Sequence, residues 1–169
     1  SVNALMTLPN GDLVAGGSFT SAGGGFAGSI ARWNGTAWSS IGLGLNGYVA
    51  VLTRLSNGDL VAGGGLWADG IARWNGTAWS PFGTGVAGVV SALTTLPNGD
   101  LVAGGGFTTA GGVAASNIAR WNGTAWSPLA PGMNDWVSAL TTLPNGDLVA
   151  GGAFTRAGSV AANYIARWN

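Results

Sequence analysis

Short apolar runs alternate along the whole chain with Gly, Asn, Asp and Ser, and none of them is long enough for a typical helix. The first run, Val2–Leu8, ends in Pro-Asn-Gly, and a second run, Asp12–Gly17, closes with a glycine pair. Short runs bounded by turn-forming residues predict β-strands. Asn-Gly between two such runs predicts a hairpin with a type I′ turn, in which both Asn10 and Gly11 have positive φ.

Two more runs complete a unit of four strands. I-A-R-W-N at Ile30–Asn34 predicts a third strand after a loop rich in Gly and Ala, and T-A-W-S from Thr36 predicts a fourth. A second Asn-Gly, at Asn34-Gly35, joins these two strands. Because the first two strands are apolar at both parities, we expect the antiparallel sheet to be covered on both faces.

The unit is repeated along the chain. Leu8–Gly17 returns nearly unchanged at Leu55–Gly64, Leu96–Gly105 and Leu143–Gly152, so successive copies start 47, 41 and 47 residues apart. A period of this length marks one supersecondary unit whose core forms only when neighbouring units stack. We expect a single propeller or half-propeller domain over 1-169, with repeats of approximately 1-47, 48-88, 89-135 and 136-169.

The motif resembles the kelch repeat, a four-stranded propeller blade. The likeness rests on the glycine pair, the hydrophobic third strand and a Trp that opens strand four, at Trp38, Trp79 and Trp126. It implies an all-β propeller of four-stranded antiparallel blades, four per chain, with the last blade lacking its outer strand because the chain stops at Asn169. Kelch repeats usually carry Tyr where this chain has Trp33 and its copies.

The sequence is compatible with three ways of closing the propeller ring. An open blade leaves an apolar wall in water, so a propeller must close. Four blades can close alone, two chains can form a homodimeric ring of eight blades about a twofold axis, or the chain can be part of a longer propeller. Because Ser1 stands where an initiator Met is expected, we expect a processed or excised piece of a longer chain.

Composition excludes several functions. The chain is 47% hydrophobic and 7% charged, with six Arg balanced by six Asp, so it offers no basic surface to nucleic acid or anionic lipid. No apolar run reaches the roughly 18 residues of a membrane span. His, Cys, Lys and Glu are absent, which removes the usual general base, thiolate and zinc or copper ligands. We therefore expect no enzyme activity, no metal and no cofactor.

Variation between the units is concentrated on one rim, formed by the loops between strands two and three and by the interblade crossovers. Aromatic rings on this rim can stack on a sugar or peptide beside polar neighbours, or they can cap the sheet ends and the seams between blades. The candidate binding residues are Tyr48, Trp67, Asp69, Asn134, Asp135 and Trp136.

Other polar residues recur with the repeat, and we expect structural roles for them. The Asn34-Gly-Thr motif and its copies match a glycosylation signal but also suit a hairpin turn. Arg54 and Arg156 are not repeated. The recurring Asp and Arg residues, which we expect to form ion pairs within each blade, are Asp12, Asp59, Asp100, Asp147, Arg32, Arg73, Arg120 and Arg167.

The favoured function is a non-catalytic scaffold or protein-interaction module, extracellular or on a bacterial surface. Its expected partners are a second copy of the chain, the rest of a longer propeller, or another protein. One alternative is a lectin-like propeller that binds glycans through its aromatic residues. Another is a recently duplicated or engineered propeller with no ligand.

Overall fold

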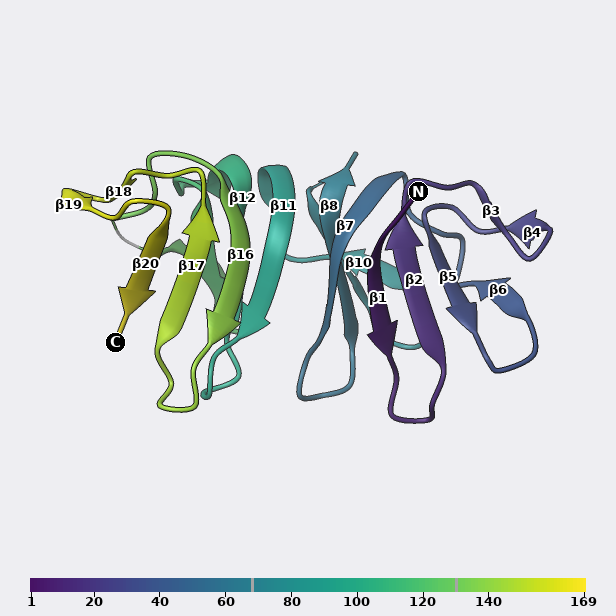
Figure 1. Ribbon diagram of the computed structural model, residues 1–169. Coiled ribbons are helices and arrows are strands. Elements are labelled where there is room, and N and C mark those ends of the chain that lie inside the picture. The colour runs from purple at the N-terminus through teal and green to yellow at the C-terminus, as the bar shows by residue number, and fades with distance from the viewer. Residues whose placement is uncertain (68, 130) are drawn as a thin grey trace.

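The computed structural model describes residues 1–67, 69–129 and 131–169, which form strands and turns without a helix (Figure 1). None of these residues belongs to a helix that could cross a membrane. The first sheet has the strand order β1-β2-β5-β6. Its strands are β1 (Val2–Thr7), β2 (Leu13–Gly17), β5 (Ile30–Trp33) and β6 (Trp38–Ser40).

The same order returns in the next sheets, with every pair antiparallel. The second sheet contains β7 (Gly47–Arg54), β8 (Leu60–Leu66), β9 (Ile71–Trp74) and β10 (Trp79–Pro81). The third contains β11 (Val86–Thr95), β12 (Leu101–Ala110), β14 (Ile118–Trp121) and β15 (Trp126–Pro128). The fourth contains β16 (Val137–Thr142), β17 (Leu148–Gly152) and β20 (Ile165–Trp168). We call these sheets blades 1 to 4, and the expected all-β blade architecture is confirmed.

The loop between strands two and three carries a small hairpin in three of the blades. Blade 1 has β3 (Ser21–Ala22) with β4 (Gly25–Phe26), and blade 4 has β18 (Arg156–Ala157) with β19 (Val160–Ala161). In blade 3 the end of β12 pairs with β13 (Val113–Ala114). The sequence predicted only loops for these segments, because runs of Gly and Ala carry no strand pattern.

The predicted type I′ turn is wrong at Asn10-Gly11. Only Gly11 has a positive φ, of 88°, and Asn10 is not among the residues with positive φ. The Gly11 N–H donates to the Leu8 carbonyl, and the Asp12 N–H donates to the Asn10 side chain. The loop therefore has three residues, 9–11, with a type I turn followed by a left-handed glycine, which is a common alternative to the two-residue type I′ turn. Gly58 has the same conformation in blade 2, where Ser56 replaces the proline, so the turn does not depend on proline.

The hydrophobic cores lie between blades rather than within them. One cluster joins blades 1 and 2 around Val14, Ile30 and Val49. A second joins blades 2 and 3, and a third joins blades 3 and 4 around Ile118 and Val137. Each blade is therefore folded against its neighbours, as expected of a stacked repeat.

The four blades follow one another in an arc, with blade 1 and blade 4 on opposite sides of the molecule (Figure 1). The innermost strands β1, β7, β11 and β16 face the concave side, and neighbouring inner strands are in contact. In the part of the chain that the structure describes, no hydrophobic cluster joins blade 4 to blade 1. A single chain therefore has two open blade faces, and the solution in which four blades close alone is not the one observed.

Candidate ligand-binding surface

Blade 2 differs from its neighbours on the variable rim because its repeat is the short one. In blades 1 and 3 the extra hairpin lies over the outer strand, where Gly23 touches Trp38 and Gly111 touches Trp126. In blade 2, β8 ends at Leu66 and β9 begins at Ile71, which leaves no room for such a hairpin. The outer strand of blade 2 is consequently uncovered on this rim.

Two hollows occupy the space beside this short loop, and together we call them the blade-2 recess. One has a volume of about 280 Å³ and lies over β10, lined by Trp79, Ser80 and Pro81. The other has a volume of about 260 Å³ and lies toward blade 3, lined by Thr84, Val86 and Thr109 among others. Leu66, Trp67 and Asp69 line both hollows.

Trp67 is the most exposed aromatic residue of the recess, with 88% of its surface accessible. Its backbone N–H donates to the Asn46 carbonyl at 3.1 Å, so the main chain is held while the indole stands in solvent. Asp69 is half-buried, and its carbonyl accepts the Val86 N–H at 2.8 Å. An exposed ring between two hollows can stack on a ligand, and the adjacent carboxylate can accept hydrogen bonds from it.

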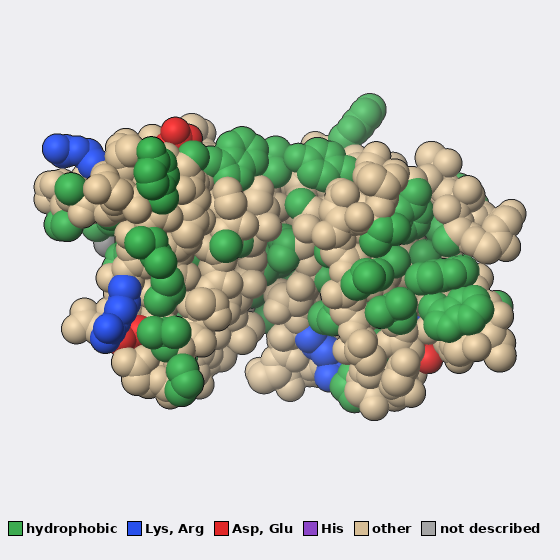
Figure 2. Space-filling model, viewed as in Figure 1, with side chains coloured by type: hydrophobic (Ala, Val, Ile, Leu, Met, Phe, Trp, Pro, Cys, Tyr) green, Lys and Arg blue, Asp and Glu red, His purple; other side chains and the backbone are tan. Residues whose placement is uncertain are grey.

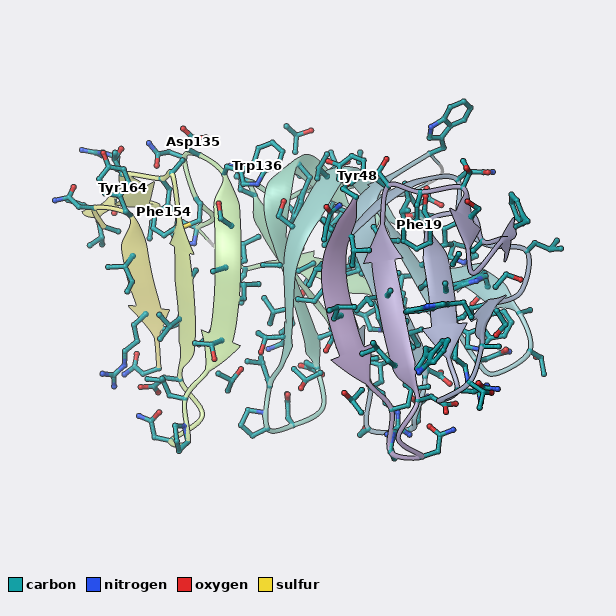
Figure 3. The ribbon with its side chains drawn as sticks, turned by 45° about the vertical axis from the view of Figure 1, so that its right-hand side comes forward. Phe19, Tyr48, Asp135, Trp136, Phe154 and Tyr164 are labelled. Atoms are coloured by element: carbon teal, nitrogen blue, oxygen red, sulfur yellow. The ribbon has the colours of Figure 1, made fainter. Side chains whose placement is uncertain are left out.

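Tyr48 and Trp136 lie elsewhere on the same rim and pack on glycines of the sheets (Figure 3). The Tyr48 ring lies across Gly65 of its own blade. The Trp136 ring lies across Gly106 of blade 3, and its Nε1 donates to Ser91 Oγ at 3.0 Å. Both rings therefore cover β-sheet ends and are only partly accessible.

Asn134 and Asp135 hold local loops together. The Asn134 side chain donates to Thr155 Oγ1 and accepts the backbone N–H groups of Thr155 and Arg156. Asp135 accepts the backbone N–H of Trp136 at 2.7 Å. The structure therefore brings together Trp67 and Asp69 of the six predicted binding residues, and it places Asn134, Asp135 and Trp136 at the seam between blades 3 and 4.

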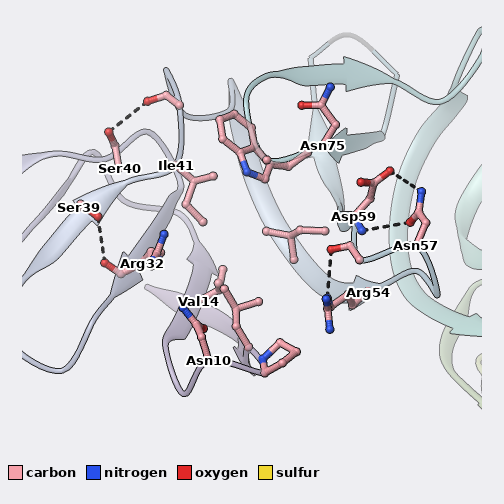
Figure 4. Close-up of a pocket in the computed structure, with 17 residues that line it drawn as sticks. Asn10, Val14, Arg32, Ser39, Ser40, Ile41, Arg54, Asn57, Asp59 and Asn75 are labelled. Carbon is pink, nitrogen blue, oxygen red and sulfur yellow. Dashed lines mark hydrogen bonds between the residues drawn. The ribbon is translucent and has the colours of Figure 1, made fainter.

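A larger hollow of about 510 Å³, on the seam between blades 1 and 2, was not singled out by the sequence (Figure 4). Its lining includes Arg32, Asp59 and Arg54, whose Nε donates to the Gly58 carbonyl at 3.0 Å. Ile41 stands here where the next seam has the larger Phe82, which packs edge-on against Trp121. The unrepeated Arg54 was the only sequence signal for this groove.

The recurring Asp and Arg residues pair within every blade. The Arg73–Asp59 and Arg120–Asp100 nitrogen–oxygen distances are 2.6 and 3.1 Å, and Arg32–Asp12 and Arg167–Asp147 form the same contact. The Asn34 side chain accepts the Thr36 and Ala37 N–H groups, so it is engaged in its own turn. Among the described residues, no three His, Cys, Asp or Glu side chains gather as a metal site.

Part of the chain matches a known family of propeller repeats. Residues 143–169 match a β-propeller domain of unknown function, DUF5122. No curated protein sequence matches the chain.

Solved structures share the fold at low identity. The WD40 β-propeller domain of Doa1 is 17% identical, with a TM-score of 0.64 over 99% of this chain and 50% of that one. Virginiamycin B lyase from Staphylococcus aureus is 17% identical, with a TM-score of 0.58 over 88% and 48%. YCF48 bound to D1 peptide is 20% identical, with a TM-score of 0.56 over 99% and 48%. The chain spans about half the length of these proteins, and the likeness establishes that it has the β-propeller fold.

Proposed function

We propose that the protein is a non-catalytic interaction module that binds an extended peptide segment of a partner protein in the blade-2 recess. The observation that carries this proposal is the accessible Trp67 indole between two hollows, beside the Asp69 carboxylate. Each hollow has a volume below the roughly 300 Å³ at which pockets for drug-sized ligands begin. Two small adjoining hollows suit successive side chains of a peptide better than one compact metabolite.

The residue inventory supports a role without catalysis. Four of the six Asp residues form ion pairs with Arg, and the chain has no His, Cys, Lys or Glu. A catalytically inactive variant of the S. aureus lyase has alanine in place of one histidine, and this chain has no histidine. YCF48, with a similar fold, is solved with a bound peptide, which is the mode of binding proposed here. Extracellular domains from B. thetaiotaomicron share the fold and are compatible with a place outside the cell.

Selection from a random peptide display library tests the proposal. Peptides enriched on the wild-type protein should bind Trp67→Ala and Asp69→Ala at least tenfold more weakly, about 1.4 kcal/mol, as measured by biolayer interferometry. Arg54→Ala is the matched control, because Arg54 lies in the groove between blades 1 and 2 and should leave binding unchanged. Selected peptides that bind Trp67→Ala as well as wild type would refute the recess as the site.

A glycan array separates this proposal from a lectin. Trp67 beside Asp69 is also an arrangement that could stack on a sugar ring and bond its hydroxyls. We expect no glycan to bind. Glycan binding that is lost in Trp67→Ala or Trp136→Ala would favour the lectin instead.

A further inference from the structure

We propose that the open faces of blades 1 and 4 are the two halves of one blade–blade interface, and that a second copy of this chain closes them head to tail. Two chains of four blades then form a ring of eight, within the usual range of about four to eight blades. Assembly of this ring does not depend on peptide binding in the blade-2 recess.

Every internal seam uses the same contact. The Val that opens the Val-x-Ala-Leu motif of strand one, or its Val-x-Val-Leu variant, packs on the first Gly of the pair in strand two of the preceding blade. A Cβ added to Gly63 would lie 2.7 Å from Val90 Cγ1, and one added to Gly104 would lie 2.5 Å from Val137 Cγ1. Gly16 meets Val49 in the same way. The glycine is therefore a notch into which the next blade inserts its valine.

The two open faces carry the unmatched halves of this contact. On blade 1, Val2 is 56% exposed and Leu5 is 63% exposed, whereas Val49, Val90 and Val137 are all 0% exposed. On blade 4, Ile165 is 64% exposed, whereas its counterparts in the internal seams are 0% to 2% exposed. The counterparts of Ile165 are Ile30, Ile71 and Ile118.

The glycine notch of blade 4 is also empty. A Cβ added to Gly151 would have no neighbour nearer than 3.8 Å within the chain. Hydrophobic side chains gather over β1 and β2 on one side of the molecule and over β17 and β20 on the other (Figure 2). Val2 and the unfilled notch at Gly151 thus lie at opposite ends of the arc of one chain, and each is available to a second copy.

Geometry and charge favour a second copy as the occupant. The head of each chain meets the tail of the other, so two chains close with two equal seams, and no unpaired face remains. Asp147 and Arg167 on blade 4 already form an ion pair with each other, as their counterparts do within the other three blades. The formal net charge of zero adds no repulsion between copies. Closing the seam therefore removes apolar surface from water without burying a lone charge.

Light scattering coupled to size exclusion measures the outcome directly. We expect a mass about twice the 16.7 kDa of one chain, independent of whether a peptide is present. A monomer at micromolar concentration would overturn the proposal. The four blades would then either remain open or be closed by further blades of a longer chain.

Gly151→Val tests the seam without disturbing the fold. The added side chain has room within the chain but fills the notch, so the variant should be a monomer with the circular dichroism spectrum of the wild type. Gly16→Val is the matched control, because it places the same side chain in an internal seam and should lower the melting temperature. A Gly151→Val protein that remains dimeric would overturn the proposal.

Engineered cysteines test the orientation, since the chain has no Cys of its own. In the internal seam a Cβ on Gly104 lies 3.0 Å from Val137 Cβ, which is about 0.5 Å below the lower limit of the roughly 3.5–4.5 Å that separates the Cβ atoms of a disulfide. Oxidised Val2→Cys/Gly151→Cys should therefore run as a covalent dimer on a non-reducing gel. Val2→Cys alone should not cross-link, and efficient cross-linking of this single variant would indicate a head-to-head dimer and refute the inference.

Discussion

A few backbone positions recur in every blade because the packing of the strands requires them. The two glycines of each pair have different structural roles. The first receives the valine of the next blade, and the second lies so close to strand one that a Cβ on Gly105 would meet the Val89 carbonyl. The residue before strand three also adopts a left-handed conformation in every blade, with φ between 60° and 67°. Its carbonyl accepts the N–H of the second glycine. These residues are Ser29, Gly70, Asn117 and Tyr164.

Tyr164 is the least suited of these residues to its conformation. A bulky side chain at φ 67° costs about 1–2 kcal/mol, and the ring is 62% exposed, so it gains little packing in return. Tyr164→Gly should therefore raise the free energy of unfolding by about 0.5–1 kcal/mol, as measured by urea denaturation. Gly70→Ala is the converse change, because it adds a Cβ at the same left-handed position, where that Cβ would also lie 2.6 Å from the Gly88 carbonyl oxygen, and it should lower that free energy. Equal stability of both variants and wild type would refute the strain.

At the scale of elements, the outer strand and the crossover after it complete each seam. Trp79 Nε1 donates to the Ile41 carbonyl, and Trp126 Nε1 donates to the Phe82 carbonyl, both at 2.9 Å. Each bond joins the outer strand of one blade to the crossover that leaves the blade before it. In blade 4 the described strands end with β20, whose outer edge has no partner strand.

Adding a strand to β20 should stabilise the protein. We expect that extending the chain after Asn169 with Gly-Thr-Ala-Trp-Ser-Pro-Leu, the sequence of 123–129, pairs a new Trp with Trp168 as Trp126 pairs with Trp121. The new backbone hydrogen bonds and the buried indole should raise the melting temperature by several degrees, at about 2–4 °C per kcal/mol for a chain of this size. An extension with Gly and Ser in place of Trp and Leu is the control. Equal melting temperatures for the two extensions would contradict the expectation.

At the scale of the whole molecule, the hydrophobic cores lie between blades, so the two terminal blades bury less apolar surface than the two central blades. Blades 2 and 3 are covered on both faces, whereas blades 1 and 4 are each covered on one. The proposed ring removes this difference. Its seam is apolar, and the Asp and Arg residues near it pair within their own blade.

The proposed dimer should therefore be insensitive to salt. Screening weakens contacts between exposed charges but leaves apolar burial nearly unchanged. We expect the dissociation constant, measured by analytical ultracentrifugation, to change less than about threefold between about 0.05 and 0.5 M NaCl. A steep loss of affinity with salt would mean that charged groups hold the chains together.

The sequence by itself determined the repeat, the strands and the blade architecture, because turn residues and alternating apolar runs act locally. It also placed the recurring Asp and Arg residues close in the same blade, since strand pairing fixes their register. It misassigned the turn at Asn10, because Asn-Gly suits a three-residue loop that ends in a left-handed glycine as well as a two-residue type I′ turn. It also missed the small hairpins, because Gly and Ala carry little pattern.

Only the tertiary structure decided which rim residues are accessible and which faces remain open. Trp67 and Trp136 are the same residue type on the same rim, yet one stands in solvent and the other packs across Gly106 of the neighbouring blade. Val2 and Val49 occupy equivalent places in the repeat, yet only Val49 has a blade in front of it. Contacts between repeats depend on what lies beside each copy in space, and identical sequence motifs cannot encode that difference.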